Sequence, residues 1–253
     1  MAIGIDRTKL IQKCKMLVSK TFVGIMHTNR LDLLETAIQS VKHIDGDIVV
    51  LNNSAECEIV PPIRDEETWG QSLRYIAKTV VNPVQPLTYS QSMNYFRQIA
   101  IHNNIPYYFV MHEDAEALDG VIKMLQEKAR VLTMHKKKWG IIFTNEDSLI
   151  AVNTDLVQEQ KWDTALPAYF ADTDFYYWAK QRGYELIESK LPVNHIKSTT
   201  INSDTVLRYK NNVTYNLYEQ YYMMKAGGNK GNEKFQTPFN NGDLFKLNLY
   251  NNG

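Results

Sequence analysis

The acidic end of the segment Tyr107–Glu116 (YYFVMHEDAE) is the part of the chain best suited to chemistry. A run of strand-forming residues ends there in His112, Glu113, Asp114 and Glu116. Because side chains alternate along a strand, we expect Asp114 and Glu116 to point the same way. Two carboxylates at the end of a buried strand can hold one Mg²⁺ or Mn²⁺ ion, which leaves positions open for substrate phosphates. The same acids also fit a solvated strand end, so the elements around them decide between the two interpretations.

Length and composition describe an ordinary globular chain. It has 253 residues, of which 44% are apolar and 22% charged, enough for a full core. Lys and Arg together equal Asp and Glu, 28 against 28, which argues against a dedicated nucleic-acid partner. Cys14 and Cys57 are the only cysteines, and no zinc-type spacing exists. No stretch predicts a signal peptide or a transmembrane segment, so we expect a cytoplasmic protein in a reducing compartment.

Strand and helix patterns alternate along most of the chain, which predicts an α/β fold with a mostly parallel sheet flanked by helices. A helix from 90 to 103 is expected to be capped by Ser90. A further helix over 203–225 predicts a helical C-terminal extension. The predicted strands are 22–26, 47–51, 80–84, 107–111, 139–143 and 148–152, and the predicted helices are 7–18, 31–43, 71–78, 90–103, 118–135, 173–182 and 203–225.

Polar residues follow three of the predicted strands at the point where each strand ends. They are His27–Arg30 after the first strand, Asn52–Ser54 after the second, and His112–Glu116 after the strand over 107–111. In open parallel sheets, ligands bind outside the carboxyl ends of the strands. The three polar groups are therefore expected to converge on one site.

Several common site types are missing from the sequence. The turn after the first strand is HTNR, without the glycines of a dinucleotide-binding turn. Neither the GxxxxGK[ST] pattern of a P-loop nor the GxSxG pattern of a serine hydrolase occurs. An α/β domain with an acidic metal site remains.

Four segments together resemble inverting glycosyltransferases of the GT-A fold, similar to glycosyltransferase family 2. They correspond in order to the family's first strand with its NRxxxL helix start, its second strand, its metal-binding DxD region and its acceptor region. The resemblance covers roughly residues 21–195. The segments are Phe22–Leu34 (FVGIMHTNRLDLL), Asp47–Ser54 (DIVVLNNS), Met111–Glu116 (MHEDAE) and Trp162–Tyr184 (WDTALPAYFADTDFYYWAKQRGY).

The resemblance implies roles for residues on the donor side. Asn52 stands where the family usually has an aspartate that contacts the base, so the identity of the base stays open. Asp114 would be the principal ligand of Mn²⁺ or Mg²⁺, Glu116 would replace the usual second aspartate, and His195 would complete the site. The other implied donor-binding residues are Thr28, Arg30, Asn94 and Glu113.

On the acceptor side, Asp172 matches the family's catalytic base and Asp174 a supporting acid, while Ala171 stands where a glutamate is common. Both aspartates could instead serve only as favourable charges at a helix N-terminus. His112 is more often a packed polar residue than a ligand. The tyrosines near 218–222 more often pack than bind a sugar.

The sequence thus predicts an enzyme with three parts: an N-terminal extension over 1–20, a GT-A domain over 21–200, and a C-terminal helix and tail over 201–253. The resemblance implies metal-dependent transfer of a sugar from a nucleoside-diphosphate donor to a glycan or other hydroxyl acceptor, with inversion. The alternatives are a sugar-nucleotide nucleotidyltransferase and a non-catalytic carbohydrate- or nucleotide-binding protein. The glycine-containing tail over 226–253 could be a lid over the donor or a passive surface segment.

Overall fold

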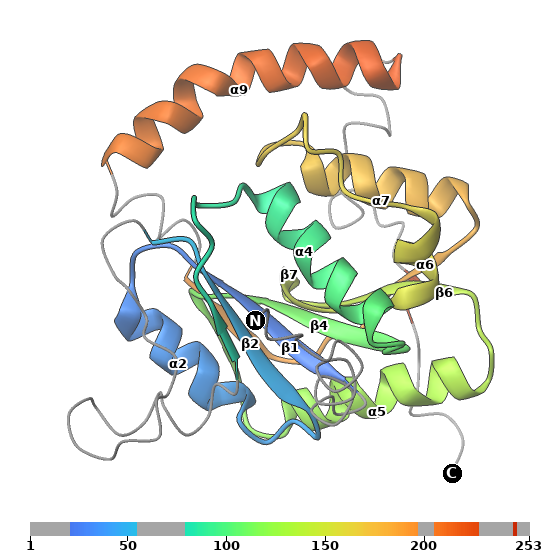
Figure 1. The fold of residues 1–253 in the computed structure, drawn as a ribbon. Coiled ribbons are helices and arrows are strands. Elements are labelled where there is room, and N and C mark those ends of the chain that lie inside the picture. The colour runs from blue at the N-terminus through green and yellow to red at the C-terminus, as the bar shows by residue number, and fades with distance from the viewer. Residues whose placement is uncertain (1–20, 55–78, 197–204, 228–244, 247–253) are drawn as a thin grey trace, which may run out of the picture.

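The computed structural model describes residues 21–54, 79–196, 205–227 and 245–246 (Figure 1). The predicted extension over 1–20, the helices predicted at 7–18 and 71–78, and the tail after 227 apart from 245–246 lie outside the described residues. That the tail over 226–253 forms a lid therefore stays a prediction.

A twisted sheet of eight strands forms the centre of the fold, in the order β10-β8-β6-β7-β4-β1-β2-β3. All neighbouring pairs are parallel except those that β7 makes with β4 and β6. A two-stranded ribbon of β5 and β9 lies beside it. The strands are β1 (Phe22–His27), β2 (Asp47–Asn52), β3 (Thr79–Val81), β4 (Tyr107–His112), β5 (Ala115–Ala117), β6 (Trp139–Thr144), β7 (Glu146–Asn153), β8 (Glu185–Glu188), β9 (Val193–His195) and β10 (Phe245–Lys246).

Helices cover both faces of the sheet, and each face has its own hydrophobic core (Figure 1). On one face, α2 (Leu31–Val41) and α5 (Val121–Met134) bury their apolar stripes. On the other lie α4 (Tyr89–His102), α6 (Thr154–Glu159) and α7 (Ala171–Gln181), with α9 (Thr205–Ala226) outside α7. The predicted α/β class, with a mostly parallel sheet flanked by helices and a further helix towards the C-terminus, is confirmed.

The start of α4 differs from the sequence prediction. Thr88, not Ser90, caps the helix, because Thr88 and Gln91 form a reciprocal capping box. The buried Ser90 hydroxyl donates instead to the carbonyl of Leu166. This bond ties the first turn of α4 to the segment before α7, so the expectation that Ser90 is the cap was wrong.

The face of α4 packs closely on β1. A Cβ atom placed on Gly24 would lie 2.7 Å from the ring carbons of Phe96, so no larger residue fits at Gly24 without moving α4. This contact fixes the distance between α4 and the strand whose end contributes to the site.

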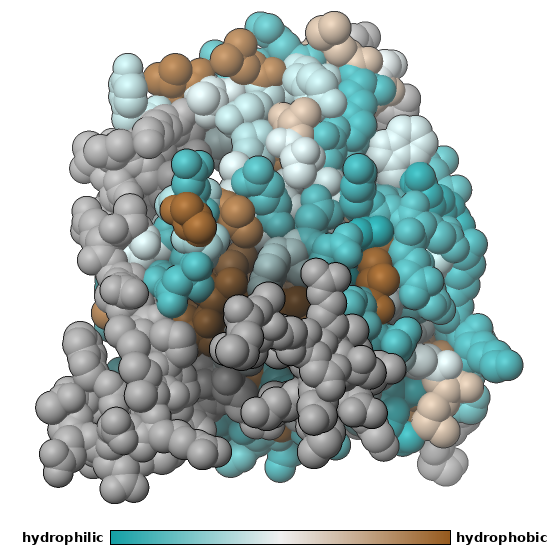
Figure 2. Space-filling view, in the orientation of Figure 1, coloured by the Kyte–Doolittle hydropathy of each residue, from teal (hydrophilic) through white to brown (hydrophobic). Residues whose placement is uncertain are grey.

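The visible surface in this orientation is largely hydrophilic, and apolar residues show in separate patches (Figure 2). One patch lies along the top edge, where Figure 1 places α9. Exposed apolar residues of α9 include Tyr209, Val213, Leu217 and Met224. Within the described part of the chain, no helix is both long and apolar enough to cross a bilayer.

Candidate functional site

The carboxyl ends of β1, β2, β4 and β6 share one edge of the sheet, and this edge carries the candidate site. Because β7 is antiparallel to β4 and β6, its first residues lie at the same edge. The chain leaves β4 through a turn at Glu113 and Asp114 and then forms β5 of the ribbon. Polar residues from distant parts of the sequence are thereby brought together.

His112, Asp114 and His195 form the one group of possible metal ligands found among the described residues. One potential ligand atom from each lies within 4.8 Å of the others. Asp114 Oδ1 is 3.3 Å from His195 Nε2, and the two imidazole rings lie 5.3 Å apart between centroids. His112 ends β4 and His195 ends β9, so the ribbon brings the second histidine to the first.

The electrostatics of this trio suit a cation. Burial alone would raise the pKa of Asp114, but the hydrogen bond with His195 and the charges of His112 and His195 outweigh it and lower the pKa. His195 Nδ1 is buried without a hydrogen-bond partner among the described residues. One donor atom from each of the three side chains lies close enough to share a single ion, so the residues present fit a metal ion.

The kind of donor atoms narrows the choice of ion. Mg²⁺ prefers an all-oxygen shell in strict octahedral geometry, whereas two imidazole nitrogens with one carboxylate suit a transition ion. Of the two ions predicted from the sequence, the donor set therefore favours Mn²⁺.

Glu116 lies outside this trio. The strand register pairs Glu116 with Asn194 and Ala115 with His195, and paired residues share a face of the ribbon. Glu116 Oε2 accepts a hydrogen bond of 3.1 Å from Asn194 Nδ2. The expectation that Asp114 and Glu116 point the same way assumed one continuous strand, but the turn at Glu113–Asp114 interrupts it.

Glu113 faces the end of β1. Its Oε2 lies 2.6 Å from His27 Nδ1 and 3.0 Å from the Thr28 backbone nitrogen. His27 and Glu113 are both buried, at 0% and 4% exposure, so this pair ties β1 to the turn that carries Asp114. Glu113 therefore has a structural contact, because it holds the end of β1 against the turn after β4.

The remaining predicted donor residues are held at the ends of β1 and β2. Asn52 Nδ2 donates to Asn82 Oδ1 at 2.8 Å, and Asn52 Oδ1 accepts from the Ser54 backbone nitrogen at 3.1 Å. Arg30 makes two hydrogen bonds, of 2.8 and 2.6 Å, with the Asp32 carboxylate. Thr28 follows β1 directly, so its position at the edge agrees with the prediction.

Asn94 has a different environment. Its Nδ2 donates to the Trp162 carbonyl at 2.8 Å and its Oδ1 accepts from the Trp162 backbone nitrogen at 3.1 Å. The side-chain amide of Asn94 thus bonds both the carbonyl and the N–H of the same residue, much as a neighbouring strand would. Asn94 therefore fastens α4 to the segment that leads to α7.

Asp172 lies in the first turn of α7, partly exposed. Burial first, and then the negative charge of Asp147, raise its pKa to about 6. The charge on Asp172 also contributes to the raised pKa values of the Tyr89, Tyr176 and Tyr222 hydroxyls, which are dominated by burial. A partly exposed carboxylate with a raised pKa can accept a proton near neutral pH.

Asp147 was missed by sequence analysis. It stands in the short segment between the predicted strands over 139–143 and 148–152. It lies near the start of β7, at the carboxyl edge, and accepts a hydrogen bond of 3.4 Å from the Tyr176 hydroxyl. An acid beside a strand end was the available signal, but nothing in the sequence places it against α7.

Asp174 is turned toward the C-terminal helix. Its Oδ2 lies 2.7 Å from Lys225 Nζ, and its exposure is 4%. Burial raises the pKa of Asp174, and Lys225 opposes the shift. The structure therefore separates the two predicted acids of α7, since Asp172 stays with Asp147 and Asp174 pairs with α9.

Comparisons with known proteins give structural likenesses alone. No protein-family model and no curated sequence matches the chain. A solved structure of glucosyl-3-phosphoglycerate synthase from Mycobacterium tuberculosis, with Mn²⁺, UDP and glucosyl-3-phosphoglycerate, is 12% identical at a TM-score of 0.47, covering 82% of each chain. A protein from Bacillus anthracis named as a glucose-1-phosphate thymidylyltransferase, in complex with sucrose, is 9% identical at a TM-score of 0.44, covering 74% of this chain and 95% of its own. At these values neither likeness bears on the activity.

Proposed function

We propose that this chain is a metal-dependent, inverting glycosyltransferase that moves a sugar from a nucleoside-diphosphate donor to an acceptor hydroxyl. The observation that carries the proposal is the His112, Asp114 and His195 trio at the carboxyl edge of the sheet. Asp172 adds a proton acceptor of raised pKa at the start of α7. These are the two chemical functions that such a transfer needs.

On the donor side, the chain would hold the leaving diphosphate. His112, Asp114 and His195 would hold Mn²⁺, which supplies positive charge to the diphosphate as it leaves. Glu113, through His27 and the Thr28 backbone, would keep the Asp114 turn in place. Asn52 and Ser54 at the end of β2, with Asn82 after β3, form the polar group where the base would lie.

On the acceptor side, Asp172 would take the proton of the attacking hydroxyl. A pKa of about 6 leaves its carboxylate ionised at neutral pH and makes it a stronger base than an ordinary aspartate. A single displacement with the acceptor opposite the leaving diphosphate inverts the sugar carbon. No enzyme nucleophile is needed in such a step.

A thermal-shift screen tests the proposal first. Ligands that bind the native state raise its melting temperature, so UDP- and GDP-sugars are expected to raise it with Mn²⁺ present and much less without it. Incubation of the best donor with candidate hydroxyl acceptors should then release the nucleoside diphosphate and form a glycosylated product. Release of the diphosphate without an acceptor, by slow hydrolysis, would still show an enzyme.

The melting temperatures and the products released on incubation together separate the alternatives. A nucleotidyltransferase would consume a nucleoside triphosphate and a sugar 1-phosphate and release pyrophosphate. A binding protein would shift in melting temperature but release no diphosphate over prolonged incubation with Mn²⁺. Either outcome would contradict the proposed transfer.

A further inference from the structure

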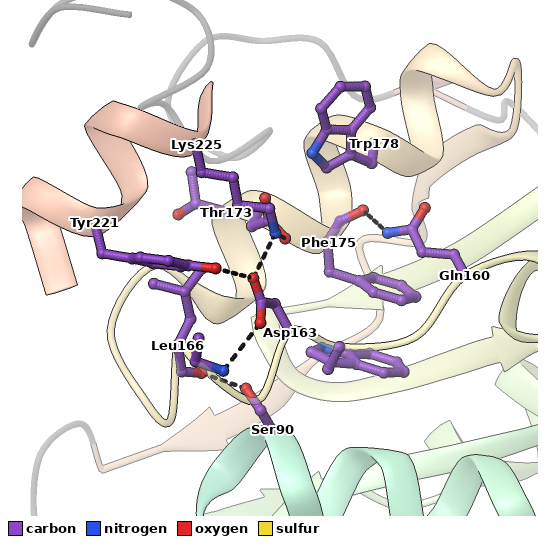
Figure 3. Close-up of polar contacts among 12 residues, drawn as sticks. Ser90, Gln160, Asp163, Leu166, Thr173, Phe175, Trp178, Tyr221 and Lys225 are labelled. Atoms are coloured by element: carbon purple, nitrogen blue, oxygen red, sulfur yellow. Dashed lines mark hydrogen bonds and ion pairs between the residues drawn. The ribbon is translucent and has the colours of Figure 1, made fainter. Parts of the chain in front are cut away.

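The C-terminal helix α9 is fastened to the segment that leads into α7. Lys225 Nζ lies 2.8 Å from Asp163 Oδ2 (Figure 3), and it also lies 2.7 Å from Asp174 Oδ2. The Tyr221 hydroxyl donates to Asp163 Oδ2 at 3.0 Å. One cation in the last turn of α9 thus bridges two acids that lie on either side of Asp172 in sequence.

The charges at this contact depend on one another. Burial acts to lower the pKa of Lys225, but its bonds to Asp163 and Asp174 outweigh burial and raise it. Burial likewise acts to raise the pKa of Asp163, and the contacts from Lys225, the Ala165 backbone and Tyr221 outweigh it. Loss of Lys225 would leave Asp174, which is 4% exposed, as a buried carboxylate without this cation.

Aromatic rings make a second contact between α9 and the same segment. Phe170 stacks on Tyr222 with ring centroids 5.5 Å apart and lies 5.3 Å from the ring of Tyr215. Tyr169 meets Tyr215 edge-on at 4.9 Å. Tyr222 is fully buried, so this face of α9 is part of the core rather than a free surface.

The backbone of Phe170 adopts an unfavourable conformation, which these aromatic contacts help to stabilise. Its φ is 64°, in the left-handed region that residues with a Cβ rarely adopt. It is the residue immediately before α7, so its conformation sets the direction in which the first turn leaves. Strained backbone of this kind persists where surrounding contacts enforce it, and it clusters at functional sites.

We propose that α9 positions the catalytic base: Lys225, with the rings of Tyr215 and Tyr222, holds both flanks of Asp172 in place for the acceptor. Phe170 lies two residues before Asp172 and Asp174 two residues after it, and α9 contacts both. Lys225 is a positioning residue in this scheme and does not touch the acceptor. The inference rests on the proposed function, because it assigns α9 a part in the same transfer.

Lys225→Met in the full chain removes the charge and keeps most of the length. Amide hydrogen exchange over 168–176 should become at least about 10-fold faster, because the local opening of that segment becomes easier. Mn²⁺-dependent binding of UDP or GDP should stay within about 2-fold. The transfer rate should fall by about 10- to 100-fold, as displacement of a catalytic group predicts.

Two control variants separate positioning from a general loss of charge. Lys225→Arg keeps the cation and should restore most of the exchange protection and the rate. Lys123→Met removes an exposed lysine of α5, on the other face of the sheet, and should change neither quantity. If Lys225→Met does not fold, Tyr221→Phe, which removes only the hydroxyl bonded to Asp163, should raise exchange over the same residues by a smaller factor.

Two results would overturn the inference: unchanged exchange over 168–176 in Lys225→Met, or faster exchange with an unchanged transfer rate. Loss of nucleoside-diphosphate binding in parallel with the rate would also overturn it, since the effect would then not be confined to Asp172. A wild-type chain that releases no diphosphate from any donor would contradict the proposed function instead, and the exchange experiment tells the two failures apart.

Discussion

Two carboxyl groups of the candidate site have pKa values shifted in opposite directions. The pKa of Asp114 is lowered by two neighbouring imidazoles despite burial, and the pKa of Asp172 is raised by burial and by Asp147. The proposed function gives these two carboxyl groups different tasks, and opposed pKa shifts suit that division. The first carboxylate stays ionised and can bind a cation, while the second can take up a proton.

Replacement of Asp172 by Asn tests the second task. Asn keeps the size and one acceptor oxygen but cannot take a proton. We expect Mn²⁺-dependent donor binding to stay nearly intact and the transfer rate to fall by on the order of 10²–10⁴. Asp174→Asn should affect the rate less, since Asp174 pairs with Lys225. Steady-state kinetics and calorimetry measure the two quantities, and wild-type transfer by Asp172→Asn would remove the base from this residue.

Asp147→Asn should change both the pH dependence and the stability. Asp172 has a folded pKa of about 6 against an ordinary value of 3.8, so its contribution to stability is complete below about pH 4 and is lost as pH rises through 6. Without the charge of Asp147 the pKa of Asp172 falls and that loss shrinks. The variant should gain about 1 kcal/mol at pH 7 and nothing at pH 3.5.

The acidic limb of the pH–rate profile should move to lower pH in the same variant. Urea unfolding at the two pH values and the profile itself are the measurements. Asn keeps a side-chain oxygen that can accept the hydrogen bond from the Tyr176 hydroxyl. A change in stability in this variant therefore does not come from loss of that bond. Equal changes in stability at both pH values would show that Asp147 acts without any link to Asp172.

At the level of elements, the ribbon of β5 and β9 decides which side chains reach the metal position. Its register puts His195 on the face of the trio and Glu116 on the other face. We expect His195→Ala to weaken Mn²⁺ binding by about 10- to 100-fold. Glu116→Gln should change it by less than about 3-fold, because Gln can still bond Asn194. Titration with Mn²⁺ followed by electron paramagnetic resonance compares the two, and a stronger effect at Glu116 would contradict this register.

The contact between α4 and the segment before α7 makes a separate prediction. Asn94→Ala removes two hydrogen bonds with the Trp162 backbone and should lower the free energy of unfolding by about 1–3 kcal/mol. Donor affinity of the folded variant should be unchanged. Gln98→Ala, at an exposed position of the same helix, is the matched control and should stay within about 0.5 kcal/mol. A selective loss of donor affinity in Asn94→Ala would restore the role that the family resemblance implied.

The parts of the fold that the sequence predicted are those with local signals. Apolar periodicity located α2 and α5, and runs of β-branched and aromatic residues located β1, β2 and β4, within a few residues. The helix α9 was located by its expected cap at Ser203 and by the glycines that follow it. The ribbon strands β5 and β9 have three residues each and gave no periodic signal. Ser90 and Asn94 bond to residues more than 60 positions away, which local patterns cannot indicate.

The same limit applies to the site. Strand ends placed Thr28, Asn52 and Asp114 correctly at one edge, because parallel strands end together. Whether His112 or Glu116 joins Asp114 depended on a turn inside HEDAE that the alternation rule does not describe.

Considered as a whole, the proposed function places the metal position and the proton acceptor along one edge of the sheet, with α9 holding the segment around the second. The proposed metal position depends on β4 and the ribbon, and Asp172 depends on α7. The helix α4 bonds to the segment before α7, and α9 contacts α7 itself. The two cores on either face fix these elements relative to the sheet. Donor binding and proton acceptance can therefore be perturbed separately, as the predicted variants require.

Calorimetry of nucleoside-diphosphate binding tests the central claim most directly. UDP and GDP are titrated into wild-type chain and into Asp114→Ala, each with Mn²⁺ and with chelator, and circular dichroism confirms that both are folded. The account predicts that wild type binds one of the two nucleotides with Mn²⁺ and that chelator or Asp114→Ala abolishes this binding. Equal affinity in the folded variant, or affinity that does not depend on the cation, would contradict a metal site at His112, Asp114 and His195.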